Sequence, residues 1–492
     1  MSPSPPRAEP EAAHPSSRHP ALIVLVLGFS SLCAALMQSL VIPIQSELPK
    51  LLDTSASNTS WIVTATLLGG AVAMPTAGRL ADIFGKKPIL IVSAAILVLG
   101  SLLCAVGGGF ALVLVGRFLQ GIAMGYVPVA ISMVHEVTPP KMVNTATAGI
   151  SATLGVGGAL GLPIAAWIAQ EYDWHALFWL SAVLAAVMTA LTAVALPHRA
   201  NRHPARFDLV GSIGLAVGLV ALLVGISKGG DWGWTDGSTL ASIIGGAAVL
   251  VLWGVYELRH RAPLVDLRTT ARLPVLLTNL AALAAGFGMM AQSIVVPQLL
   301  QMPEQTGYGL GQTILQAGLW MAPAGLMMLA FAPISSAMLT RIGGRLTLAI
   351  GAAVIAGGYL VAAFMTDEAW KLMVASCISA AGVGIGYAAM PTLIMDNVPR
   401  SEAGSGVGVN SLMRSMGTTV AGAVMAVVLT SQTMTLAPGT PSIPTHDAFR
   451  LCFLIGAGAA LVAAALTLFI PRRPRPAPVR DERVESELEA VH

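Results

Sequence analysis

Long apolar stretches alternate with short polar segments along almost the whole chain. The stretches end at charged residues, glycine or proline, and they approach the roughly 20 residues that a helix needs to cross a bilayer. Because unpaired backbone groups cannot be left in hydrocarbon, each stretch is expected to be helical. The pattern predicts fourteen membrane-spanning helices, near residues 21–43, 60–80, 88–106, 109–134, 144–169, 176–196, 209–227, 238–256, 273–298, 312–335, 346–365, 370–395, 404–430 and 448–470.

The basic residues are divided unequally between the two faces that these spans would create. One face, which includes both tails, contains most of the Lys and Arg residues. The opposite face has only Lys50, Lys228, Lys371 and Arg450. The positive-inside rule places the basic face in the cytoplasm. We therefore expect a multi-pass protein of the inner (plasma) membrane with both termini cytoplasmic.

Composition supports one integral membrane body. Of the 492 residues, 55% are hydrophobic and 10% are charged, so little sequence remains for a domain outside the membrane. The four cysteines lie within apolar stretches and show no close pairing, which argues against a metal or redox site. The sequence has no G-x-x-x-x-G-K-[ST] motif, so ATP hydrolysis is not indicated and a gradient is expected to supply energy.

An internal repeat indicates how the spans are grouped. The segment 75–90 aligns without gaps with 333–348, so that Gly85 matches Gly343 and Lys87 matches Arg345. Spans 1–6 then correspond to spans 9–14, an arrangement typical of secondary transporters. The predicted segments are a disordered cytoplasmic tail, a first six-helix bundle, a linker with two inserted helices, a second six-helix bundle and a second disordered tail, at residues 1–20, 21–197, 198–271, 272–470 and 471–492.

The connection after span 2 has a distinctive pattern. Its glycines allow a tight turn and a close approach of helices, and an Asp between helix ends can pair with Arg or bind a helix N-terminus. The segment resembles the cytoplasmic loop signature of the major facilitator superfamily, although a basic loop that only sets topology is an alternative. The resemblance assigns a gating role to Gly78, Arg79, Asp82, Gly85, Lys86 and Lys87.

Two further motifs extend this resemblance. In span 4, Arg117 with Gln120 and Gly121 resembles the R-x-x-q-G motif, whose arginine is implicated in proton transfer in that superfamily. A buried arginine in a membrane is by default a functional candidate, with a structural bond to backbone carbonyls as the alternative. Span 5 partly resembles the antiporter motif of exporters, and close helix packing is the alternative explanation for its small residues Gly157, Gly158, Gly161 and Pro163.

With the fourteen spans, these motifs resemble the fourteen-helix drug:proton antiporter family, which contains exporters of drugs and antibiotics. The resemblance implies an all-α integral membrane protein with the major facilitator fold, in which two six-helix bundles are joined by two inserted helices. It covers roughly residues 21–470.

One departure from the family concerns proton coupling. Many members have an acidic residue in span 1, whereas no Asp or Glu lies deep in any predicted span here. The carboxylates nearest to the spans, Glu47, Asp82, Glu136 and Asp396, are expected near span ends. The candidates for proton coupling are therefore Arg117, Asp82, His135 and Glu136. The alternatives are that proton coupling is absent or that a deprotonatable substrate carries the proton itself.

A substrate path needs polar, aromatic and methionine side chains that face inward. Methionine suits adaptable contacts with varied ligands, and Arg414 could neutralise an anionic group. The candidates for substrate binding are Gln38, Gln120, Tyr126, Asn279, Met289, Gln292, Trp320, Asn410 and Arg414.

Taken together, the sequence predicts a secondary transporter that exports small amphipathic drugs, antibiotics or secondary metabolites by alternating access, in exchange for protons. The alternative is an uptake or facilitative carrier for a small metabolite. We expect no enzymatic activity, no metal and no cofactor other than the proton gradient. The expected partners are a small-molecule substrate and the lipid bilayer, with no nucleic acid, and the chain is expected to be a monomer.

Overall fold

The computed structural model describes residues 20–41, 44, 47–197, 205–436 and 442–471. In this part of the chain, fourteen helices or broken helices are long and apolar enough to cross a membrane, and each coincides with one predicted stretch. The predicted tails lie outside the described residues, apart from Pro20 and Pro471. Leu25 and Leu252, each 69% exposed within apolar helices, show the kind of surface that contacts lipid.

The first bundle contains six spans, of which the fourth is broken by a 3-10 turn. Its helices are α1 (Pro20–Ser39), α3 (Ala56–Phe84), α4 (Lys86–Val106), α5 (Phe110–Ile122), η1 (Ala123–Gly125), α6 (Tyr126–Val137), α7 (Pro140–Glu171) and α8 (His175–Ala195), and the short α2 (Leu48–Leu51) follows α1. Within this bundle α1 packs along α7, and α4 packs along both α5 and α8.

The second bundle also contains six spans, two of them broken. Its elements are α12 (Leu273–Gln301), η2 (Glu304–Thr306), α13 (Ile314–Ala330), α14 (Ala332–Arg341), α15 (Gly343–Phe364), α16 (Ala369–Gly386), α17 (Ala389–Met395), η3 (Arg400–Glu402), α18 (Ala403–Ser431), β1 (Thr433–Met434), β2 (Ile443–Pro444) and α19 (His446–Leu468). The two short strands pair antiparallel, with Thr433 opposite Pro444.

The internal repeat is visible in the positions where the chain bends. Gly85 and Gly343 both have positive φ, 95° and 81°, at the turns that open α4 and α15. Glycine adopts such angles without steric cost. The fourth span of each bundle is interrupted within a G-x-x-x-G-Y sequence, at residues 121–126 and 382–387. The two bundles thus share local geometry as well as span order.

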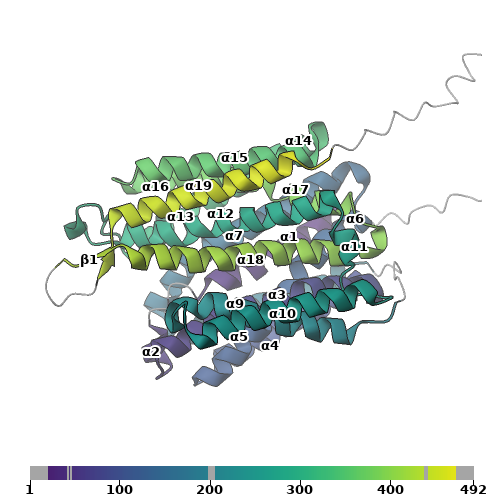
Figure 1. The fold of residues 1–492 in the computed structure, drawn as a ribbon, viewed down its shortest axis with the longest axis horizontal. Coiled ribbons are helices and arrows are strands. Elements are labelled where there is room, and N and C mark those ends of the chain that lie inside the picture. The colour runs from purple at the N-terminus through teal and green to yellow at the C-terminus, as the bar shows by residue number, and fades with distance from the viewer. Residues whose placement is uncertain (1–19, 42–43, 45–46, 198–204, 437–441, 472–492) are drawn as a thin grey trace, which may run out of the picture.

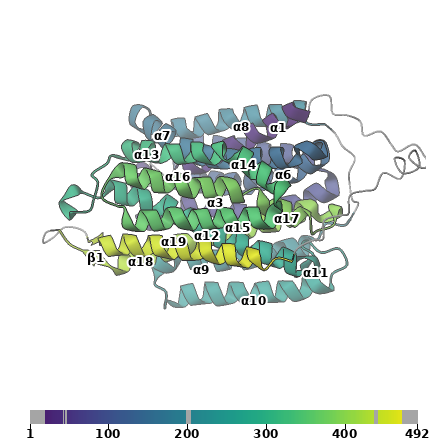
Figure 2. The same cartoon turned by 90° about the horizontal axis from the view of Figure 1, so that it is seen from above.

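The two inserted helices pack at the side of the paired bundles. Helix α9 (Leu209–Trp232) contacts both α3 and α18, and α10 (Gly237–Arg259) packs against α9. Figure 2 shows α10 at the outer edge, beyond α9. An apolar cluster joins Leu215 and Leu219 of α9 to Leu68 of α3 and Leu412 of α18. Helix α9 therefore covers the seam between the bundles on this side.

The ends of the helices form two faces. Helices α6, α17 and α11 (Leu267–Thr270) lie at one end of the molecule in both views, and β1 lies at the other (Figures 1 and 2). We call these ends the α11 face and the hairpin face. Near the α11 face, the apolar core of the first bundle continues into the second through Val275, Ile394 and Val407.

Candidate functional site

The turn between α3 and α4 is held by its basic residues. Gly85 ends α3, and Lys87 donates a 2.7 Å hydrogen bond to the carbonyl of Leu196, just after the last helix of the first bundle. At the equivalent place in the second bundle, Arg345 donates to the carbonyl of Leu468 at the end of α19. Cations stabilise the unpaired carbonyls at a helix C-terminus. Both turns are thereby anchored to their own bundle.

Asp82 joins the two bundles at the α11 face. Its Oδ1 accepts a 2.9 Å hydrogen bond from the backbone N–H of Gly404, and its Oδ2 accepts one of 2.9 Å from that of Ser405. These N–H groups belong to the first turn of α18, where they have no partner within the helix and where an anion is stabilised. The contact is possible because Gly78, one turn earlier on α3, lies against the backbone of Gly404. We call Asp82, Gly404 and Ser405 the acidic latch.

A second contact joins the bundles through the equivalent helices of the repeat. Asn144 of α7 donates a 3.2 Å hydrogen bond to Thr340 of α14, and the hydroxyls of Thr145 and Ser336 lie 2.8 Å apart. In the alignment of the repeat, Thr340 corresponds to Asp82 and Ser336 corresponds to Gly78. We call these four residues of α7 and α14 the hydroxyl latch.

The other charged residues of the predicted gate lie beside the acidic latch. Lys86 is buried, donates a 3.2 Å bond to the carbonyl of Ser132 and forms an ion pair with Glu136. His135 is adjacent, and its buried Nδ1 has no hydrogen-bond partner. Arg79 is half-buried on the last turns of α3. The structure therefore brings together most of the predicted coupling residues at one end of the first bundle.

Arg117 is the predicted coupling residue that stands apart. It is 3% exposed, donates a 2.7 Å hydrogen bond to Gln120 Oε1, and its Nε has no partner. Gln120 in turn donates a 2.9 Å bond to Ser101 of α4. Glu136 lies nineteen residues further along the same broken span, which corresponds to roughly 28 Å at 1.5 Å per residue. A direct proton transfer between these two groups is incompatible with that separation.

The glycine-rich part of α7 has two distinct surfaces. Side chains added at Gly157 and Gly161 would meet α1, so these glycines allow the two helices to approach closely. Gly158 faces open space. It lies about 180° around the helix from Trp167, which is 52% exposed on the outer surface. Gly158 therefore lies on the face of α7 opposite Trp167, while the backbone of Pro163 lies 3.5 Å from the position that a Cβ on Gly318 of α13 would occupy.

The substrate-binding candidates of the first bundle differ in accessibility. Gln38 is exposed, although it lies about 180° around α1 from the outer residue Phe29. Tyr126 is fully buried, and its hydroxyl is 3.0 Å from that of Thr192. Gln120 is buried in its bonds to Arg117 and Ser101. Only Gln38 of these three is available to a ligand in this conformation.

The candidates of the second bundle form a polar strip along α12 and α18. Asn410 donates a 3.0 Å hydrogen bond to Asn279, and both are buried. Further along α18, the half-buried Arg414 guanidinium lies 4.5 Å from the centre of the Tyr387 ring. Met289 is close by, since it borders a small apolar cavity with Tyr387. This strip offers a cation, a ring and amides to a bound molecule.

Two remaining candidates lie nearer the hairpin face. Trp320 of α13 donates a 3.0 Å hydrogen bond from Nε1 to Gln312. The backbone N–H of Gln292 donates a 2.7 Å bond to the Tyr359 hydroxyl, while its buried Nε2 has no partner. Of these two residues, Gln292 therefore has a buried side-chain N–H group that is not hydrogen-bonded.

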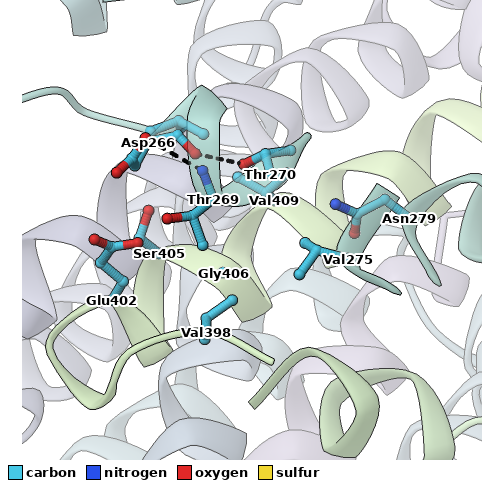
Figure 3. A pocket seen from close by; sticks show the side chains of 11 residues that line it. Asp266, Thr269, Thr270, Val275, Asn279, Val398, Glu402, Ser405, Gly406 and Val409 are labelled. Atoms are coloured by element: carbon cyan, nitrogen blue, oxygen red, sulfur yellow. Dashed lines mark hydrogen bonds between the residues drawn. The ribbon is translucent and has the colours of Figure 1, made fainter. Parts of the chain in front are cut away.

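A small cavity lies between α11 and the start of α18 (Figure 3). Asp266 on its rim caps α11 by accepting bonds from the N–H groups of Arg268 and Thr269, at 2.8 and 3.3 Å. Glu402 and Ser405 border it from the other side. It is far smaller than the sites that hold drug-sized ligands. This end of the seam is therefore closed to substrate in this conformation.

The sequence model of the Major Facilitator Superfamily matches residues 27–422 and 372–491. The chain belongs to the major facilitator superfamily. It is a multi-pass membrane transporter and not an enzyme, as the sequence predicted.

Curated relatives of this major facilitator protein include transporters of bacteria. It is 26% identical over 495 residues to the "Uncharacterized MFS-type transporter EfpA" of Mycobacterium tuberculosis, covering 96% of this chain and 92% of the relative. It is 28% identical to the "Probable actinorhodin transporter" of Streptomyces coelicolor, covering 76% and 66%. It is 24% identical to the multidrug transporter protein MdtP of Bacillus subtilis, covering 86% and 78%.

Solved structures show the same fold at low identity. The human organic anion transporter MFSD10 superposes with a TM-score of 0.63 at 14% identity, covering 91% of this chain and 99% of that one. The proton:xylose symporter XylE superposes with a TM-score of 0.64 at 14% identity, covering 93% and 97%. These likenesses establish the fold.

Two buried carboxylates of this major facilitator protein are not among the site residues predicted from the sequence. Asp208 precedes α9 and is 5% exposed, and Glu257 lies in the last turn of α10 and is 2% exposed. Both lie at span ends, where an acidic residue is ordinarily solvated, so hydropathy alone did not single them out. The sequence F-D-L-V-G at 207–211, an Asp followed by a glycine three residues later, was the available signal.

Proposed function

We propose that this protein exports small amphipathic drugs, antibiotics or secondary metabolites by alternating access, in exchange for protons. The α11 face is cytoplasmic in this proposal, because the basic residues gather in its connections. The single observation that carries the proposal is the acidic latch. A carboxylate of one bundle on the helix N-terminus of the other is a contact that closes one face and can break when the bundles rock.

Two features support a path from the opposite side. Gln38 is exposed, and nothing lies within 4 Å of a side-chain carbon added at Gly158, so both positions are accessible to a ligand in this conformation. The polar strip with Arg414 and Tyr387 offers cation and ring contacts to an amphipathic molecule. The names of the multidrug and actinorhodin relatives support a drug or an antibiotic as the substrate class.

Ethidium accumulation in pump-deficient bacteria tests the proposal. Cells that express the protein are expected to accumulate less ethidium than cells with the empty vector, and a protonophore should remove the difference. Arg117→Ala should abolish the export at unchanged expression, because a buried cation between helices is lost. The proposal would be contradicted if expressing cells and empty-vector cells accumulated equal amounts of several amphipathic dyes, or if the expressing cells took up more dye.

A further inference from the structure

Two buried carboxylates face each other beside the seam, where α9 begins and α10 ends. Asp208 Oδ1 accepts bonds from the Gly211 N–H at 2.8 Å and from the Tyr256 hydroxyl at 3.0 Å. Glu257 Oε2 accepts a 3.0 Å bond from the N–H of Leu264. The remaining oxygens, Asp208 Oδ2 and Glu257 Oε1, are buried and have no hydrogen-bond partner.

Gly211 shows how close these two oxygens are. A side-chain carbon added there would be 2.5 Å from Glu257 Oε1 and closer still to Asp208 Oδ2. Both free oxygens therefore border the same small space. Two carboxylates that share a buried site cannot both stay ionised without a large cost, whereas one proton held between them satisfies both oxygens.

In the part of the chain that the structure describes, one ion-pair contact reaches the two carboxylates, and its partner, His260, is charged only when the ring is protonated. Among the described residues, Tyr256 donates to Asp208, and His260 Nε2 lies 4.0 Å from Asp208 Oδ2, beyond hydrogen-bond reach. The indole N–H of Trp253 is directed toward Glu257 but completes no hydrogen bond of normal geometry. Within the described chain, no group of three or more His, Cys, Asp or Glu side chains is placed to hold a metal ion.

A continuous series of hydrogen bonds connects this pair to the acidic latch. Glu257 accepts from the Leu264 N–H, and the Leu264 carbonyl accepts a 3.3 Å bond from the Ser405 hydroxyl. The Ser405 N–H donates to Asp82. Helix α9 also packs on both α3 and α18, so Asp208 caps the helix that covers the seam, and Glu257 lies on the neighbouring α10. The carboxylate pair is thus connected through Leu264 to the first turn of α18.

We propose that Asp208 and Glu257 form a proton-binding site that holds one shared proton while the α11 face is closed and releases it when that face opens. The proton passes to water on the α11 side when that face opens, both carboxylates become solvated, and a proton is taken up again from that water when the face closes. By linkage, acid pH stabilises the closed face, and rising pH favours opening. The inference rests on the proposed proton exchange and names the group that carries the proton.

The experiment measures the gate without any substrate. Spin labels are attached to Met142→Cys and Ile342→Cys, exposed positions at the α11 ends of α7 and α14, after the four native cysteines have been replaced. Distance distributions are recorded in lipid nanodiscs across a pH series. The short-distance population is expected to fall as pH rises, and Glu257→Gln should keep it high at every pH, since the neutral amide retains the bond to Leu264.

Three comparison variants locate the titrating group. His260→Gln should leave the pH dependence intact, because that ring is not hydrogen-bonded to the pair. Gly211→Ala should weaken the dependence by forcing the carboxyls apart, whereas Gly245→Ala on α10, with open space beside it, should not. Infrared spectra of the wild type should show a protonated carboxyl band at neutral pH that Glu257→Gln removes.

Two outcomes would overturn the inference: an unchanged pH dependence in Glu257→Gln, or its complete loss in His260→Gln. Because the gate is observed directly, this result is separable from the ethidium assay. A pH-dependent gate in a protein that exports no dye would leave the proton site standing and remove the proposed substrate class. Dye export together with a gate whose pH dependence is unchanged in Glu257→Gln would support the proposed substrate class and rule out the proton site.

Discussion

The two latches occupy equivalent places in the repeat, yet they use different chemistry. In the acidic latch a carboxylate binds two backbone N–H groups, those of the second and third residues of α18. In the hydroxyl latch the partners are side chains of Asn144 and Thr145, the fifth and sixth residues of α7. Backbone N–H groups are free only in the first turn of a helix. A shift of one turn therefore replaces an anion site by neutral side-chain bonds.

This difference indicates which of the two latches contributes more to the free energy of closing the α11 face. Hydrogen bonds to a charged group contribute about 1.5–3 kcal/mol, and neutral ones contribute about 0.5–1.5 kcal/mol. We expect the acidic latch to carry most of the free energy of closure. The hydroxyl latch should mainly keep α7 and α14 in register.

The largest effect is expected for Gly78→Ala. A methyl group at this position would meet the backbone of Gly404, so that one of the two helices must shift. Overpacking of this kind typically costs about 1–3 kcal/mol, and here it also lengthens both bonds of Asp82. The short-distance population of the spin-label pair should largely disappear. Gly149→Ala on α7, where nothing lies near the added carbon, is the matched control and should behave like the wild type.

Asp82→Asn should have the next largest effect. The amide keeps one acceptor but loses the charge and one of the two bonds to α18. A loss of about 1.5–3 kcal/mol shifts the gate toward the open form by roughly 10- to 100-fold, at 1.4 kcal/mol per factor of ten. Asp53→Asn, which removes the charge of an exposed carboxylate, serves as the control. A closed population equal to that of wild type would show that the helix N-terminus does not need the anion.

Exchanging the residues of the two latches sharpens the comparison. The double variant Asp82→Thr with Thr340→Asp has the same composition as the wild type. It should remain as open as Asp82→Thr alone, because the new carboxylate faces the second turn of α7, whose N–H groups are already used. Recovery of closure in the double variant would mean that charge matters and position does not.

The smallest effect is expected for Thr340→Val. This change removes the acceptor for Asn144 and keeps the shape of the side chain. It should lower the free energy of closure by about 0.5–1.5 kcal/mol, a shift of roughly 2- to 10-fold. The same spin-label measurement checks it, with Thr430→Val in the distant half of α18 as the control. A shift as large as that of Asp82→Asn would show that the two latches contribute equally to the free energy of closure.

Some local features of the chain could be predicted from the sequence. Gly85 and Gly343 were aligned from sequence, and both have the positive φ that glycine adopts without cost. The position of Asp82 between helix ends also suggested a helix N-terminus as its partner. The roles assigned to Arg117, His135 and the substrate-binding residues, the proton-driven energy source and the segment boundaries remain predictions.

Other parts of the site could not be predicted from pattern. Asn279 and Asn410 were chosen separately as inward-facing polar residues, but only the packing of α12 on α18 places them in one hydrogen bond. Tyr126, Gln120 and their partners proved to be buried, since several faces of one helix can be covered inside a bundle. Hydropathy reports that a helix lies in the membrane, not which neighbour covers each face.

The sequence by itself determined the fourteen spans, the repeat and the turn glycines, because each depends on the hydrophobicity or backbone freedom of neighbouring residues. The tertiary structure alone decided that Asp82 meets α18, that the equivalent Thr340 meets the second turn of α7, and that Asp208 faces Glu257. These contacts join residues far apart in the chain. Their partners are selected by how helices pack against one another, and no local pattern records that choice.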